Sequence, residues 1–235
     1  MAQCKLVLPH MSSTNNSIPT VHRTIVYLDG YNLYHGLMDR YDRKYLWLDL
    51  TRFALSLLSD PRQQLISTKY FTSEAPGGST SDSWQRQQTY WKALKSCPML
   101  EVVKGSYREK AVRCKSCRLA EAECKACGQK LVFRNEKRTD VNIATHLVRD
   151  ACEGNFEVAI LVSGDTDLVP AVEVVKEKKC RIVVGFPPDR ATNDMKDAAG
   201  GAAFKITEGQ LKRSQFPRRV EIAPGIWVER PTKWW

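Results

Sequence analysis

Apolar and polar positions along the chain follow two periodicities, one typical of buried strands and one typical of helices. Short apolar, β-branched runs predict six strands, at residues 24–28, 64–72, 100–104, 156–162, 181–186 and 203–207. Apolar residues at helical spacing predict helices between them, at residues 31–41, 46–58, 81–96, 139–151 and 167–178. Strands that alternate with helices predict an α/β fold, with a mostly parallel sheet covered on both faces.

The same pattern divides the chain into one main domain with attached segments. Residues 1–22 are polar and without periodicity, so we expect them to be disordered. The main domain is expected over residues 23–210, with an insertion at residues 105–135 and a tail or hairpin at residues 211–235. A chain of 235 residues is long enough to bury one full core.

Two of the predicted strands end abruptly in aspartate. The run TIVYLDGYN contains Asp29 and Asn32, and the run VAILVSGDTDLV contains Asp165 and Asp167 after its apolar part. Ligands of open α/β sheets bind at the carboxyl ends of the strands, so we expect these side chains to face one crevice. Asp140, at the start of the helix before the second run, could reach the same edge.

Carboxylates gathered at one place repel one another and require a cation. Two unit charges about 4 Å apart repel by about 4 kcal/mol at an effective dielectric near 20. Oxygen ligands select hard ions such as Mg²⁺ or Mn²⁺, and such ions accept phosphate oxygens and activate water. Each aspartate alone is more typical of a turn or a helix cap. Their matched positions together favour a metal site for phosphodiester hydrolysis, with Asn32 orienting a water or a phosphate.

Four cysteines form the strongest local motif of the chain. Cys114, Cys117, Cys124 and Cys127 make two CxxC pairs separated by six residues, a spacing typical of a tetrahedral Zn²⁺ site. Because four thiolates leave no open position on the ion, we assign the zinc a structural role. A redox dithiol or a pair of disulfides is the less favoured alternative.

Positive charge is concentrated around these cysteines. The chain has a net charge of +10, and residues 104–138 hold 11 basic and only 4 acidic residues. This clustering favours a polyanionic partner such as single-stranded RNA over a merely solvated surface. The expected contacts to the RNA backbone are Lys115, Arg118, Lys125, Lys130, Lys137 and Arg138.

The sequence contains no sign of a membrane protein. Its longest apolar runs are far shorter than the about 20 residues that span a bilayer, and its first ten residues do not read as a targeting segment. We therefore expect a cytoplasmic protein without a membrane partner. A homo-oligomer is left open.

Three blocks of the sequence resemble the signature blocks of the NYN domain, a branch of the PIN-like nucleases. They are DGYNLYHGL at residues 29–37, KRTDVNIATHLVRDA at residues 137–151 and LVSGDTDLVPAV at residues 161–172. The resemblance runs over residues 24–207 and implies a Rossmann-like three-layer sandwich with metal-dependent ribonuclease activity. It places the acidic residues of the family at Asp29, Asp140, Asp165 and Asp167, with Asn32 and Lys137 as accompanying polar positions.

Two other functions stay open. Many NYN relatives carry an acidic residue before the final strand, where this chain reads GGAAF at residues 200–204, so binding of RNA without cleavage is one alternative. The resemblance also extends to bacterial members assigned as NADH-dependent hydroxylases of pyridine compounds, such as 6-hydroxy-3-succinoylpyridine in nicotine breakdown. The chain has neither a GxGxxG fingerprint nor a flavin motif, so its residues give this redox alternative no support of their own.

Overall fold

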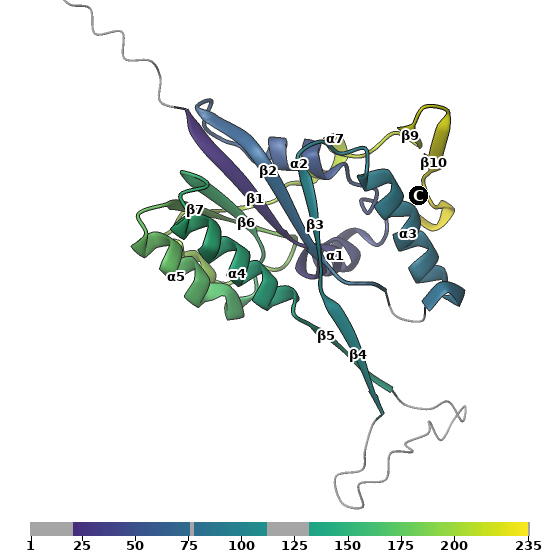
Figure 1. Cartoon of the computed structure of the whole chain (residues 1–235), viewed down its shortest axis with the longest axis horizontal. Helices are drawn as coiled ribbons and strands as arrows, with labels where there is room; N and C mark the ends of the chain where they lie inside the picture. Colours follow the sequence, from purple (N-terminus) through teal and green to yellow (C-terminus); the bar gives the residue numbers. More distant parts are fainter. Residues whose placement is uncertain (1–20, 76–77, 112–131, 235) are drawn as a thin grey trace, which may run out of the picture.

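The computed structural model describes residues 21–75, 78–111 and 132–234. Six strands form its main sheet, namely β1 (His22–Asp29), β2 (Gln63–Thr72), β3 (Leu100–Lys104), β6 (Val158–Val162), β7 (Arg181–Phe186) and β8 (Ala203–Lys205). Their order is β3-β2-β1-β6-β7-β8, and every neighbouring pair is parallel (Figure 1). The predicted parallel α/β sandwich is confirmed.

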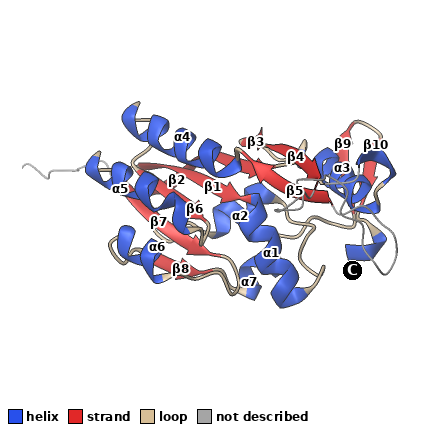
Figure 2. Ribbon diagram, turned by 90° about the horizontal axis from the view of Figure 1, so that it is seen from below, coloured by secondary structure: helices blue, strands red, loops and turns tan. Residues whose placement is uncertain are grey.

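Helices cover both faces of the sheet (Figure 2). The first face carries α1 (Gly30–Tyr41), α2 (Leu50–Ser56), α3 (Asp82–Leu94) and α7 (Glu208–Arg213), and the second carries α4 (Thr139–Cys152), α5 (Val169–Glu177) and α6 (Asn193–Ala198). Successive residues of a strand point to opposite faces, so Val26 and Leu28 of β1 join the first core, whereas Ile25 and Tyr27 join the second. Among the helices of the described residues, none is long and apolar enough to cross a membrane.

The C-terminal residues complete the first core. The hairpin of β9 (Arg219–Ala223) and β10 (Ile226–Glu229) follows α7. After it, Trp234 packs against Trp47 and Tyr90, with ring centres 6.2 and 5.7 Å apart. Trp47 is fully buried and donates a hydrogen bond of 2.9 Å to the carbonyl oxygen of Pro217. These contacts bind the tail to the sheet domain.

A two-stranded ribbon interrupts the fold between β3 and α4. Strands β4 (Ser106–Ala111) and β5 (Val132–Lys137) pair antiparallel and project away from the main sheet (Figure 1). Ala111 and Val132, which flank the segment of residues 112–131, lie opposite each other. This segment lies outside the described residues, so the zinc site stays a prediction. It contains the four predicted zinc ligands, Cys114, Cys117, Cys124 and Cys127, and four of the predicted RNA-binding residues, Lys115, Arg118, Lys125 and Lys130.

The pattern of apolar residues does not predict four of the observed elements. Strands β4 and β5 contain many charged residues and no long apolar run in their sequences, and the two strands pair with each other. Helices α6 and α7 have six residues each, too few for a visible helical period. A capping box sets the start of α7, in which Thr207 accepts a hydrogen bond from the backbone of Gln210.

Two predicted boundaries differ from the structure. The disordered N-terminal segment was expected to include His22, but this residue already pairs with Gln63 in β1, and the rest of that segment lies outside the described residues. The helix expected over residues 46–58 begins only at Leu50. Its start is set by the Asp49 side chain, which accepts a hydrogen bond of 2.9 Å from the first turn of α2.

Candidate functional site

Asp29 lies where β1 ends and α1 begins. Its Oδ1 accepts a hydrogen bond of 2.9 Å from the N–H of Asn32, which caps the helix. Its Oδ2 accepts a second bond of 2.7 Å from the hydroxyl of Ser163. The residue is only 2 % exposed, so both bonds hold a buried carboxylate in one orientation.

The loop that follows β6 is tied to the start of α1. The Oγ of Ser163 accepts a bond of 3.0 Å from the N–H of Asp165, and the side-chain oxygen of Asn32 accepts one of 3.0 Å from the N–H of Gly164. A Cβ atom on Gly164 would overlap the carbonyl oxygen of Arg190, so only glycine permits this close approach of two backbones. The loop therefore has little freedom to move Asp165.

The position of this loop agrees with the rule for open α/β sheets. β1 and β6 are neighbours, and the order of the strands reverses between them, because β2 and β3 lie on one side and β7 and β8 on the other. Ligands bind at such a reversal, outside the carboxyl ends of the strands. Asp29 is the last residue of β1, and Asp165 is the third residue after the end of β6.

Asp140 reaches the site from α4, on the second face of the sheet. It lies in the first turn of this helix. The residue between β5 and α4 is Arg138, whose φ of 81° lies in the left-handed region that residues other than glycine rarely adopt. A sharp turn thus connects the inserted ribbon directly to the helix that carries Asp140.

Three of the predicted carboxylates meet at this edge. One oxygen from each of Asp29, Asp140 and Asp165 lies within 4.8 Å of the other two. Burial is the main reason that the pKa of Asp29 is raised to about 6, and the hydrogen bonds from Asn32 and Ser163 act against it. The negative charges of the other two aspartates add to the increase. A divalent cation would offset the repulsion among the three carboxylates, and such oxygen donors suit Mg²⁺ or Mn²⁺.

The remaining predicted site residues surround this group. Asp167 is exposed, and its N–H donates a hydrogen bond of 3.0 Å to Oδ1 of Asp165, but its carboxylate is not one of the three that meet. Asn32 uses its side-chain oxygen to hold the loop after β6. Lys137 ends β5 and Arg138 is exposed at the turn into α4. The catalytic and RNA-binding roles of these four residues stay predictions.

Sequence reasoning missed Ser163 and Gly164. Ser163 is fully buried and bonds to both strand-end aspartates, once through the side chain of Asp29 and once through the backbone of Asp165. A signal was present, because Ser-Gly directly after an apolar run is typical of a turn in which a side chain bonds to the backbone. The pattern of carboxylates alone does not reveal it.

Two known proteins are similar to this chain over most of its length. A protein of Pseudomonas putida named 6-hydroxy-3-succinoylpyridine 3-monooxygenase is 28 % identical over an alignment of 243 positions, and this alignment covers 89 % of this chain and 76 % of that protein. The crystal structure of a protein of unknown function from Vibrio parahaemolyticus has a TM-score of 0.52 at 17 % identity, and the match covers 84 % of this chain and 98 % of that chain. At this identity the second likeness concerns the fold alone.

The sequence model of the NYN domain matches residues 23–204. This range includes the three aspartates that meet, the loop after β6 and nearly all of the six-stranded sheet. It also contains the three blocks on which the resemblance rests. The chain therefore belongs to the NYN domain family.

Proposed function

We propose that this protein is a metal-dependent endoribonuclease that hydrolyses phosphodiester bonds of single-stranded RNA. The observation that carries the proposal is the meeting of Asp29, Asp140 and Asp165 within 4.8 Å, at the point where the strand order reverses. Membership of the NYN family supports the same chemistry, because NYN domains are in general nucleases.

The three aspartates would hold Mg²⁺ or Mn²⁺. A bound ion of this kind lowers the pKa of a coordinated water and stabilises negative charge on a phosphoryl oxygen. Asp29 orients its oxygens through Asn32 and Ser163, while Asp165 is oriented by the backbone N–H of Asp167. Asp167 itself is exposed beside the group and is suited to act through a water molecule.

The inserted ribbon is suited to hold the RNA. It leaves the main sheet after β3 and returns one residue before α4, so its base lies at the same edge as Asp140. Lys137 and Arg138 occupy this base, and Lys115, Arg118, Lys125 and Lys130 belong to the segment beyond the ribbon. Contacts between such cations and phosphates depend strongly on salt, so RNA affinity should fall steeply as the salt concentration rises.

A cleavage assay with labelled single-stranded RNA and Mn²⁺ tests the proposal. Asp165→Asn should reduce the cleavage rate by about 100-fold or more, whereas Asp167→Asn, acting through water, should cost about tenfold. Asp197→Asn, an exposed aspartate on α6, is the matched control and should cleave like the wild type. Equal rates for the wild type and Asp165→Asn would exclude the mechanism.

The similarity to the Pseudomonas putida protein supports a second candidate, NADH-dependent hydroxylation of a pyridine compound. NADH oxidation that requires an added hydroxypyridine, without RNA cleavage, would favour this candidate. RNA binding without cleavage in the wild type would instead favour a non-catalytic binding module.

A further inference from the structure

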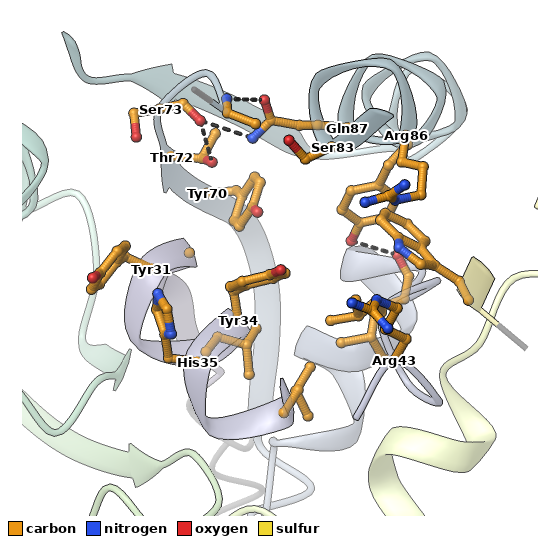
Figure 3. Close-up of a pocket in the computed structure, with 18 of the residues that line it drawn as sticks. Tyr31, Tyr34, His35, Arg43, Tyr70, Thr72, Ser73, Ser83, Arg86 and Gln87 are labelled. Carbon is orange, nitrogen blue, oxygen red and sulfur yellow. Dashed lines mark hydrogen bonds between the residues drawn. The ribbon is translucent and has the colours of Figure 1, made fainter. Parts of the chain in front are cut away.

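An aromatic cavity with a volume of about 460 Å³ lies on the face of the sheet that α1 covers, and Figure 3 shows side chains that line it. Its walls come from α1, from the end of β2 and from α3, and Trp234 of the tail contributes to them. Gly30 and Tyr31 line it, and they directly follow Asp29 in the chain. The volume falls within the range of about 300–1,000 Å³ that is typical of small-ligand sites.

Aromatic rings on α1 form one side of the cavity. Tyr31, Tyr34 and His35 lie within one helical turn, with ring centres 4.3 Å apart for Tyr31 and His35 and 5.3 Å apart for Tyr34 and His35. The two tyrosines are 53 % and 43 % exposed, unlike the buried Tyr70 that lines the cavity from β2 (Figure 3). Exposed rings of this kind offer flat faces on which a nucleobase can stack.

Two arginines line the opposite side from Tyr31 (Figure 3). A guanidinium nitrogen of Arg43 lies 3.5 Å, and one of Arg86 lies 3.7 Å, from a carboxylate oxygen of an aspartate on the same segment. Both distances are longer than the about 2.7–2.9 Å of a charge-assisted hydrogen bond. Glu74 is the single acidic residue among the described lining residues, and it already pairs with Lys104 at 3.6 Å. The cavity therefore combines aromatic faces with guanidinium groups, which suit phosphate.

Two polar groups of the cavity are already bonded to the protein. Gln87 accepts a hydrogen bond of 2.6 Å from the N–H of Ala75 and donates one of 2.8 Å to the carbonyl oxygen of Ser73. The hydroxyl of Tyr90 donates a bond of 2.9 Å to the carbonyl oxygen of Leu48. These two groups therefore have fewer free positions for reading a base, whereas the exposed rings of Tyr31 and Tyr34 offer stacking, which tolerates every base.

We propose that this cavity binds the unstacked base of the ribonucleotide adjacent to the cleaved phosphate, while Arg43 and Arg86 hold a neighbouring phosphate. Helix α1 connects the two sites, because Asp29 caps it and its first two turns carry Tyr31 and Tyr34. The inference rests on the proposed ribonuclease function. It specifies the substrate as an unpaired strand with little base preference, since a base within a duplex cannot enter a cavity.

The test measures the binding of labelled uridine pentamers to the full-length protein. The protein carries Asp165→Asn, so that the RNA stays intact, and a pentamer is too short to slide freely along the binding site. Each pentamer lacks the base at one position. One such abasic position should lower the affinity by about tenfold, the loss expected for one stacked base. When Tyr34→Ala is added to the Asp165→Asn protein, the affinity for the complete pentamer should fall by a similar factor. The abasic position should then cause no further loss of affinity.

A matched control separates this effect from a general loss of aromatic surface. Trp227→Ala removes a ring of similar exposure, 49 %, from β10 and should preserve the cost of the abasic position. Thermal unfolding verifies that each variant is folded, as expected for a substitution at the half-exposed Tyr34.

Two results would overturn the proposal. One is a folded Tyr34→Ala protein with unchanged affinity for the pentamers. The other is binding of a free hydroxypyridine carboxylate that depends on Tyr34, together with no cost at any abasic position, which would assign the cavity to a small aromatic acid. Failure of the nuclease function would show separately, as equal cleavage by the wild type and Asp165→Asn, because these binding measurements require no cleavage.

Discussion

The hydroxyl of Ser163 donates a hydrogen bond of 2.7 Å to Oδ2 of Asp29, across a separation of 134 residues in the sequence. The bond joins the ends of two adjacent parallel strands, β1 and β6. The same Ser163 oxygen accepts the N–H of Asp165. One small side chain thus sets the positions of two of the three carboxylates that meet.

Ser163→Ala should weaken Mn²⁺ binding about 10- to 100-fold, because residues that orient metal ligands contribute to affinity on this scale. Isothermal titration with Mn²⁺ measures the change. Ser96→Ala is the control, since it also removes a serine hydroxyl that donates a hydrogen bond, of 2.7 Å to the carbonyl oxygen of Ala93, on a segment that carries no site residue. A similar loss in both variants would show that Ser163 only supports the fold.

Gly164→Ala should abolish the site and destabilise the protein by about 2 kcal/mol or more, because the new methyl group overlaps the backbone of Arg190. Urea unfolding and Mn²⁺ titration together measure both effects. Gly209→Ala is the control, since its methyl group meets the flexible tip of Arg213 within α7 and, at an ordinary contact distance of 3.9 Å, the hydroxyl of Thr207. Alanine is the better helix former, so the control should be as stable as the wild type or slightly more stable. An unaffected Gly164→Ala protein would contradict the packing described for the loop after β6.

Lys69→Met should destabilise the protein by about 3–5 kcal/mol at neutral pH. The Nζ of Lys69 lies 2.6 Å from Oδ2 of Asp150, the hydroxyl of Tyr27 donates to the same oxygen at 2.7 Å, and the aspartate is 2 % exposed. Removal of the cation would leave a buried carboxylate without its charged partner. Urea unfolding at pH 7 measures the loss.

The pH dependence of this loss provides a second check. Burial alone would raise the pKa of Asp150, but the hydrogen bonds from Lys69, Tyr27 and Asn155 outweigh it and hold the pKa below its usual range. The ionised carboxylate therefore contributes stability above its unfolded pKa of about 3.9, and this contribution is lost as the pH falls through the lower folded pKa. The difference between wild type and Lys69→Met should be largest above about pH 5 and should narrow in acid. A constant difference from pH 7 to pH 2.5 would contradict this account.

The purified protein should contain one zinc per chain, held by the four cysteines. The double substitution Cys114→Ser and Cys117→Ser should remove the zinc and weaken RNA binding about tenfold, because the basic segment would lose its fold. Mn²⁺ binding at the aspartates should persist, since the four cysteines lie between β4 and β5 in the sequence and the three aspartates belong to other segments of the chain. Metal analysis of the wild type and the variant measures the zinc, and its absence from the wild type would contradict the prediction.

The parallel sheet and both strand-end aspartates could be predicted from the sequence, because the spacing of apolar residues is a local property and parallel strands share one edge. β4 and β5 could not be predicted in this way, since their charged residues interrupt the apolar pattern by which a strand is predicted. The two strands pair with each other, and this pairing is not visible in either sequence alone. The aromatic cavity could not be predicted from the sequence either, because Tyr31 on α1 and Arg86 on α3 line opposite sides of it only after the two helices pack on one face of the sheet.

The sequence by itself determined the fold class and the family and indicated four candidate carboxylates, because each of these depends on residue types and their spacing along the chain. Only the tertiary structure decided which carboxylates meet. Asp140 joins Asp29 and Asp165 because α4 begins at the edge where β1 and β6 end. Asp167, although two residues from Asp165, stays outside the group, since residues two apart at the start of a helix do not face each other. Proximity in space depends on which strands pair, and that pairing is a property of the whole chain.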